Sequence, residues 1–445
     1  FNDLDAQVWP MSAKRGRAGD LQIAGISAID LVREFGTPLF VFDEQDVRER
    51  ARRYVNAFKN EEIPTTVFYA AKAFMTTKIA KWVTQEGMCI DVCTEGELEV
   101  ALRAGIEPAR ILFHGNNKSV AELEKAVDVG VGRIVVDSFI EIERLNQIAL
   151  ARGVVQQVLI RLTVGVEAHT HSYIATAHED QKFGLSLASG VALEAAEAVI
   201  AADGLSLLGL HSHIGSQIFD AEGFEVAAHR VIDGAVQIRD THNFIVTEIN
   251  LGGGMGIAYE NDDDPLDVQQ MANKLYEIVE NECHRVSFPL PKLAVEPGRA
   301  IIGPAGITLY EVGTVKSVDV SESQSRRYIS VDGGMSDNIR TALYDATYTV
   351  TLASRASTAA LTDSRVVGKH CESGDIVIRD ASMPADIVPG DLLAVAATGA
   401  YCRAMASNYN HLPRPAVIGV HAGKKEIILH GETIDDVLRL DPGVK

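Results

Sequence analysis

Cysteine is scarce in this chain, and its five copies are scattered. They stand at Cys89, Cys93, Cys283, Cys371 and Cys402, an odd number with no C-x-x-C spacing. Such a set excludes a disulfide framework and a cysteine-based zinc site, and it favours a reducing compartment. The first residues show neither the basic start nor the apolar run of an export signal. We therefore expect a cytoplasmic protein.

Long apolar runs are also absent, and so is an excess of positive charge. No stretch of about 18 apolar residues occurs, so we expect no membrane-spanning helix. Lysine and arginine total 41 against 61 acidic residues, which gives a formal net charge of −20. An acidic surface disfavours nucleic acid and anionic membranes as partners. An anionic ligand would therefore need cations that are concentrated locally.

The chain does have the length and apolar content for two domains. Its 445 residues exceed one average domain, and 47% of them are hydrophobic, which is ample for a large core. Eight strand-like runs alternate with helical patterns, and they lie near residues 66–72, 88–93, 111–116, 133–137, 158–162, 207–213, 248–251 and 293–295. This alternation predicts a (β/α)8 TIM barrel over residues 44–304.

The alternation of strand-like and helical patterns ends after Arg299. Short β-type runs separated by Gly, Pro and Asp turns continue to residue 429. They predict an all-β second domain, a β-sandwich or β-barrel-like fold built from residues 1–43 and 305–445.

Reactive residue types stand at the ends of the predicted barrel strands. They are Lys72, Asp91, His114 with Asn116, Arg161, His213, the glycine run 252–256 and the segment 296–299. Because chemistry in such barrels occurs at the C-terminal ends of the strands, we expect these side chains to ring one mouth. Their convergence is the main argument for an active site.

Lys72 has two interpretations. It ends an apolar, aromatic-rich strand, so it is either a cation with its stem on the sheet or a lysine able to form a Schiff base. The residues around it do not decide between them.

The glycine run 252–256 follows a strand and is typical of a phosphate cradle, because glycine lets backbone N–H groups approach an anion and a helix start adds a positive dipole end. His211 and His213 leave three readings open: a metal pair, a cofactor-stacking His213 with Ser216 on a phosphate, or buried histidines. His169, His171 and His178, in one long loop, fit solvated side chains.

Glu296 and Arg299 put an acid and a base three residues apart. They form either a rim ion pair or a functional pair, with Glu296 on a ring nitrogen and Arg299 on an anion. Cys371 beside Glu372 gains a role only where its loop reaches a barrel mouth.

Together these segments resemble the fold-type III pyridoxal-phosphate decarboxylases, and within them the diaminopimelate decarboxylases. The resemblance covers nearly the whole chain and rests on residues 69–73, 211–216, 252–254, 296–299, 370–375 and 399–401. It implies decarboxylation of meso-diaminopimelate to L-lysine and CO2, with pyridoxal 5'-phosphate as cofactor and no metal.

The resemblance also assigns roles to individual residues. Lys72 would hold the cofactor covalently, His213 would stack on its ring, and Cys371 would donate a proton. The cofactor set would be Lys72, His213, Ser216, Gly254, Glu296, Pro297, Gly298, Arg299 and Tyr401. The substrate set would be Arg299, Arg340, Tyr344, Glu372 and Tyr401. The family forms homodimers, so Cys371 and Glu372 would act in the partner's site.

Two other functions stay open. A decarboxylase of ornithine, arginine or carboxynorspermidine would share the fold, but two arginines disfavour a ligand that ends in a bare amine. A non-catalytic binding protein would lack the cofactor lysine, whereas Lys72 is present.

Overall fold

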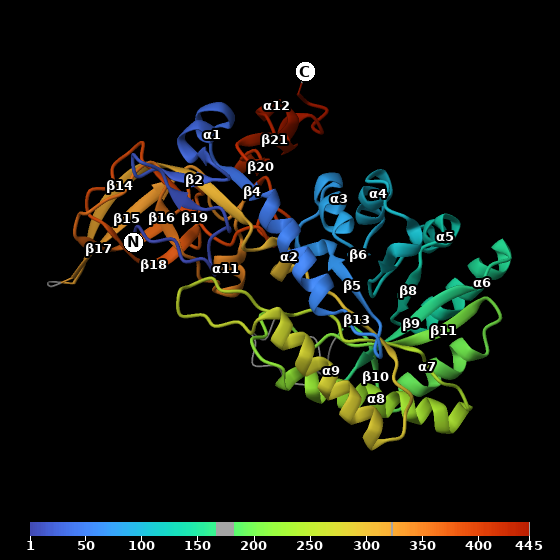
Figure 1. The fold of residues 1–445 in the computed structure, drawn as a ribbon. Coiled ribbons are helices and arrows are strands. Elements are labelled where there is room, and N and C mark those ends of the chain that lie inside the picture. Colours follow the sequence, from blue (N-terminus) through green and yellow to red (C-terminus); the bar gives the residue numbers. More distant parts are fainter. Residues whose placement is uncertain (166–181, 322–323, 445) are drawn as a thin grey trace. The chain divides into compact units, whose positions relative to one another are not determined.

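The structure is a computed structural model that describes residues 1–165, 182–321 and 324–444, so His169, His171 and His178 lie outside the described residues. The chain divides into two compact units (Figure 1). The barrel unit comprises Arg48–Gly256 and Pro265–Gly298, and the sheet unit comprises Phe1–Val47, Ile257–Asp264 and Arg299–Lys445. Ile257–Asp264, which lies inside the range 44–304 expected for the barrel, packs with the sheet unit.

Eight parallel strands among the described residues close into a ring in the barrel unit. In ring order they are β5 (Thr65–Ala70), β6 (Cys89–Val92), β7 (Ile111–Phe113), β8 (Arg133–Val136), β9 (Gln156–Thr163), β11 (Leu205–His211), β12 (Glu248–Asn250) and β13 (Lys292–Val295). Val295 lies opposite Val67, and this β13–β5 pairing closes the ring. The short strand β10 (Leu185–Ser186) pairs with β9. The predicted TIM barrel is confirmed.

Helices follow the strands along the chain (Figure 1). They are α2 (Glu44–Ala57), α3 (Thr77–Gln85), α4 (Glu95–Arg103), α5 (Val120–Val129), α6 (Phe139–Arg152), α7 (Val191–Ile200), α8 (Glu222–His242) and α9 (Val268–Arg285). The strands are almost wholly buried, as their continuous apolar runs predict. Five barrel strands (β5, β7, β8, β9 and β13) contribute Phe68, Leu112, Val135, Leu159 and Ala294 to one buried cluster. Of the helices described, none is long and apolar enough to cross a membrane.

Side-chain hydroxyls cap two helices of the barrel unit. The Ser138 hydroxyl accepts from the Glu141 N–H at 3.3 Å at the start of α6. The Thr94 hydroxyl accepts from the Glu97 N–H at 3.2 Å at the start of α4. The Glu97 carboxylate accepts in turn from the Cys93 N–H at 2.7 Å, one residue before the cap, so the pair resembles a capping box that is displaced by one residue on its acidic side.

The sheet unit is built on a mixed sheet with the order β18-β17-β15-β14-β4-β20-β21, and β19 joins β16 to β14. Its strands are β1 (Lys14–Arg15), β2 (Leu21–Ile23), β3 (Ile26–Ser27), β4 (Leu39–Asp43), β14 (Gly306–Ser321), β15 (Gln324–Val331), β16 (Val350–Leu352), β17 (Leu361–Val367), β18 (Ile376–Pro384), β19 (Leu392–Val395), β20 (Ala416–His421) and β21 (Lys424–Leu429). It also carries α1 (Ala28–Phe35), α10 (Arg299–Ile302), α11 (Arg340–Tyr344) and α12 (Ile434–Leu438). β4 pairs with both β14 and β20, so the N-terminal segment completes this unit as predicted.

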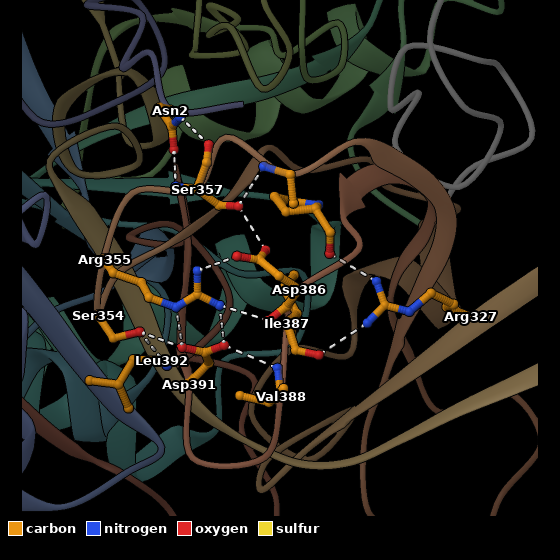
Figure 2. Close-up of polar contacts among 12 residues, drawn as sticks. Asn2, Arg327, Ser354, Arg355, Ser357, Asp386, Ile387, Val388, Asp391 and Leu392 are labelled. Carbon is orange, nitrogen blue, oxygen red and sulfur yellow. Dashed lines mark hydrogen bonds and ion pairs between the residues drawn. The ribbon is translucent and has the colours of Figure 1, made fainter.

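Two arginines tie the turns of the sheet unit together (Figure 2). Arg355 forms ion pairs with Asp386 at 2.8 Å and Asp391 at 2.9 Å. Arg327 donates to the carbonyls of Pro384 and Ile387 at 2.8 and 3.1 Å. A guanidinium group can bind several acceptors at once, because its N–H donors point in fixed directions from one planar group. The network thus fixes the 384–391 loop against the sheet.

Candidate active site

The end of β5 and the 296–298 segment are packed closely together. Lys72 sits in a 3-10 turn (Ala71–Ala73) that follows β5. The Ala70 N–H donates to the Pro297 carbonyl at 3.2 Å. A Cβ atom at Gly298 would lie 2.9 Å from the Ala70 Cβ. Glycine at this position therefore lets the backbone that carries Glu296 approach the end of β5, just before Lys72.

Glu296, just beyond β13, is buried among donors from three other strand ends. Its Oε1 atom accepts from His114 Nε2 at 2.8 Å and from Asn250 Nδ2 at 2.7 Å. His211 Nε2 lies 3.3 Å from Oε1 and 3.4 Å from Oε2. These residues follow or end β7, β12 and β11, so the ends of four barrel strands meet at one carboxylate. The convergence expected from the strand pattern is present at this point.

The donors keep Glu296 ionised. Burial alone would raise the pKa of Glu296, but His114 and His211 hold it well below its usual range. Burial lowers the pKa of His211 to about 4 and also lowers that of His114. Both imidazoles are therefore neutral near pH 7, and they act on the carboxylate through N–H donation rather than through full charge.

His114, His211 and Glu296 also form a group that could hold a metal ion, because their ligand atoms lie within 4.8 Å of one another. This group is not the metal pair considered from the sequence, because it contains His211 but not His213. The N–O distances of 2.8 and 3.3 Å in the group are explained by direct hydrogen bonding to the carboxylate. His213 has other partners.

His213 lies two residues beyond β11 and is half-buried. Its Nδ1 accepts from the Gly253 N–H at 3.3 Å, which places the ring proton on Nε2 in the neutral form. Burial, and then the charges of Lys72 and Arg161, lower the pKa of His213 well below its usual value. The structure thus presents a neutral imidazole near Lys72.

Asp91, the third residue of β6, belongs to the same charge group. Burial and then the Glu296 carboxylate raise the pKa of Asp91 well above its usual value, while Lys72 opposes the shift. Two neighbouring buried carboxyls do not both ionise easily, so their pKa values separate. Asp91 holds the proton and Glu296 carries the charge.

The glycine run lies against the loop that follows β11. Ile218 donates to the Gly254 carbonyl at 2.8 Å, and Gly256 donates to the Ile218 carbonyl at 2.9 Å. Gly254 has φ +108°, and a Cβ there would lie 2.6 Å from the Gly215 carbonyl oxygen. No helix follows directly, since α9 begins only at Val268. The expectation that a helix start adds its dipole directly behind this run is therefore wrong. The expected close approach of the backbone is present.

Within the sheet unit, Arg299 and Arg340 are buried and share one phenol. Arg299 Nη1 lies 2.5 Å and Arg340 Nη1 lies 3.0 Å from the Tyr259 hydroxyl oxygen. The Tyr401 ring lies 4.8 Å from the Arg299 guanidinium carbon and 5.9 Å from that of Arg340. The Tyr344 ring lies 6.0 Å from the Arg340 guanidinium carbon. Four residues of the predicted substrate set are thus neighbours.

Cys371 and Glu372 are exposed and lie on a loop of the same unit. The Cys371 N–H donates to Asn410 Oδ1 at 3.3 Å. The Glu372 carboxylate accepts from the Gly374 N–H at 3.3 Å. His370, the residue before them, is buried and bonded to Ser336 at 2.7 Å. The loop therefore has a fixed base and presents two exposed reactive side chains.

Three contributors were not singled out from the sequence. Asn250 ends β12 immediately before the glycine run, and that position could have pointed to it. Tyr259 and Tyr348 carry no comparable signal. Tyr259 lies in Ile257–Asp264, which packs with the sheet unit, and Tyr348 lies in a loop. Their proximity to the arginines arises only when the chain folds.

Comparison with known proteins agrees with this geometry. Residues 44–303 match the family model of the pyridoxal-dependent decarboxylase pyridoxal binding domain. The diaminopimelate decarboxylase of Mycobacterium tuberculosis strain H37Rv is 58% identical over 442 residues, which is 98% of each chain. A crystal structure of diaminopimelate decarboxylase from M. jannaschii in complex with L-lysine has a TM-score of 0.89 and 30% identity over 97% of each chain.

A second crystal structure, of the Helicobacter pylori diaminopimelate decarboxylase complexed with L-lysine, has a TM-score of 0.84. It is 28% identical, and the match covers 93% of this chain and 98% of the other. The family model spans more than half of the chain, and the mycobacterial relative is matched almost end to end. The chain therefore belongs to the pyridoxal-dependent decarboxylases and, within them, to the diaminopimelate decarboxylase family.

Proposed function

We propose that this protein decarboxylates meso-diaminopimelate to L-lysine and CO2 with pyridoxal 5'-phosphate as its cofactor. The observation that carries the proposal is the environment of Glu296. Its Oε1 atom is occupied by two buried donors at 2.7 and 2.8 Å, while the one contact of Oε2 among the described residues is long, at 3.4 Å. An ionised carboxylate with one accepting oxygen suits a protonated ring nitrogen.

The residues present fit this cofactor. Lys72 supplies a primary amine at a strand end, and the half-buried His213 supplies a neutral ring. Close backbone packing at Gly254 leaves no space for a Cβ atom, as a phosphate cradle requires. Gly254, Ser216 and the 297–299 segment would hold the phosphate, and Lys72 would hold the cofactor covalently. When bound, the cofactor supplies the electron sink for the bond to the departing carboxylate.

The protein's own groups have distinct tasks in this proposal. Glu296 would hold a proton on the ring nitrogen, because the pKa of Glu296 stays low. His213 would pack against the ring without adding charge, because the pKa of His213 is also low. Asp91 keeps its proton beside Lys72, so the mouth does not gather excess negative charge. Together these groups would favour the delocalisation of the substrate's negative charge into the cofactor ring.

Substrate choice would come from the arginine pair. Diaminopimelate keeps a second amino-acid head after it loses CO2, and Arg299 and Arg340 offer two cations for the carboxylate of that head. Tyr344 and Tyr401 would complete this side. A ligand that ends in a bare amine would leave the buried cations without an anion, which penalises ornithine-like substrates.

The remaining groups would come from a second subunit. We propose a homodimer in which Cys371 of the partner subunit donates a proton to the carbon that loses CO2. Glu372 of the partner subunit would accept a hydrogen bond from the substrate ammonium group. The exposure of both residues on a loop with a fixed base supports this arrangement.

A substrate screen tests the proposal. The cofactor-loaded protein should release CO2 and L-lysine from meso-diaminopimelate, and it should be at least about 100-fold less active on ornithine or arginine, as expected when a buried charge stays unpaired. Lys72→Ala is the matched inactive control. Faster turnover of ornithine or arginine would overturn the substrate assignment, and full activity of Lys72→Ala would overturn the cofactor chemistry.

A further inference from the structure

Two buried guanidinium groups in the sheet unit are bridged by one phenol oxygen. Arg299 and Arg340 are each 6% exposed, and both donate to the Tyr259 hydroxyl, at 2.5 and 3.0 Å. Two like charges repel each other, and burial strengthens the repulsion. The oxygen between them offers a shared acceptor that draws both cations to one point.

The bridging oxygen uses its acceptor capacity on the arginines. A hydroxyl has two acceptor lone pairs and one O–H donor. Because Arg299 and Arg340 each donate to the Tyr259 oxygen, its proton must point away from both of them. The O–H can therefore donate to a third group, and a ligand carboxylate placed there would lie close to two cations and accept from one O–H donor.

The position of Tyr259 is fixed by its own backbone and ring. Thr349 Oγ1 donates to the Tyr259 carbonyl at 2.8 Å, and the Tyr259 N–H donates to Asp263 Oδ2 at 2.8 Å. The ring meets that of Tyr348 edge-on, with 5.2 Å between centroids. Tyr348 in turn accepts from Arg340 Nη1 at 2.6 Å. Both hydrogens of that Nη1 are thus directed at phenol oxygens, so the arginine is held in one orientation.

We propose that Tyr259 is a specificity-determining residue for the carboxylate of the retained amino-acid head. Its oxygen aligns the two guanidinium groups, and its O–H donates to the carboxylate. The inference rests on the proposed function, because that function supplies a ligand with such a head. It adds a residue that the sequence pattern of the site did not contain.

The test compares two ligands that differ at this carboxylate. L-lysine carries it, whereas L-lysinamide is of similar size and lacks the negative charge. Their dissociation constants are measured by calorimetry on cofactor-loaded wild-type protein and on Tyr259→Phe. A hydrogen bond to a charged group corresponds to about 10- to 100-fold in affinity. We expect Tyr259→Phe to weaken L-lysine by that factor and to change L-lysinamide by less than about twofold.

Tyr328→Phe, a change in β15, is the matched control and should leave both ligands unaffected. Equal weakening of both ligands by Tyr259→Phe would indicate a structural role and overturn the inference. An unchanged L-lysine affinity would overturn it as well, while a wild-type preference for L-lysine would leave the proposed function standing. A wild-type protein that binds both ligands alike would overturn the inference together with the substrate assignment.

If Tyr259→Phe does not fold, Tyr348→Phe serves as a second variant. It removes the other phenol that orients Arg340, and it should reduce the preference for L-lysine by about 10-fold. Retention of the full preference in Tyr348→Phe would contradict the idea that phenols align this pair.

Discussion

The hydrogen bond from His114 to Glu296 offers a direct test of how the barrel keeps this carboxylate ionised. His114→Leu removes the donor at 2.8 Å while it keeps an apolar side chain in the buried space. The net charge does not change, because burial lowers the pKa of His114 and the imidazole is neutral near pH 7. The bonds from Asn250 and His211 remain, so the effect of one donor is isolated.

The expected magnitude follows from the strength of a charge-assisted bond. Such a bond contributes about 1.5–3 kcal/mol, and one pKa unit corresponds to about 1.36 kcal/mol. His114→Leu should therefore raise the pKa of Glu296 by about one to two units. Since the pKa of Glu296 is lowered by folding, its contribution to stability is present above the unfolded value and is lost as pH falls through the folded value. The variant should thus be less stable at neutral pH by about 1.5–3 kcal/mol.

Two measurements check this expectation. Chemical denaturation at pH 8 should show the loss of stability, and the acidic limb of the kcat profile should move to higher pH. His114→Gln is the control, because its Nε2 amide can donate from a similar position and should restore most of both properties. An acidic limb that stays in place in His114→Leu, or a glutamine variant as impaired as the leucine one, would refute the reasoning.

Three further changes probe other parts of the protein. Gly254→Ala should weaken cofactor binding, measured by titration with pyridoxal 5'-phosphate, by at least about 10-fold, because Gly254 has φ +108° and a Cβ there would meet a backbone carbonyl. Gly423→Ala is the control, because Gly423 has φ +76° but open space around it, and this variant should leave cofactor binding unchanged. Lys118→Met should lower the free energy of unfolding by about 3–5 kcal/mol, because it strips a fully buried ion pair of its cation, and denaturant melts measure this. Mixing inactive Lys72→Ala with inactive Cys371→Ala should restore up to about a quarter of wild-type activity if sites are shared between subunits, and no recovery would speak against a shared site.

The chemistry of the barrel mouth depends on both local and distant information. Lys72, His114 and Glu296 are each marked locally, because each follows an apolar strand. The strand pattern therefore predicts which residues face the mouth. It does not predict that Asn250 and His114 share one oxygen of Glu296, since that depends on the register of strands that lie far apart in the chain.

The sheet unit shows the limit more clearly. Arg299 and Arg340 could be proposed as ligand residues from the family resemblance, but the phenols that they contact could not. Tyr259 reaches this unit because a segment that follows the glycine run leaves the barrel and packs elsewhere. No periodicity or turn signal records such a departure.

The amino-acid sequence by itself determined the order and type of the elements, because apolar period, glycine turns and helix caps act over a few neighbouring residues. It also determined the reactive residue types at the strand ends. Only the tertiary structure decided which oxygen of Glu296 is occupied, which tautomer His213 adopts and which phenol joins the two arginines. Those properties depend on distances of about 3 Å between residues up to 182 positions apart, and such distances are set by packing of the whole fold.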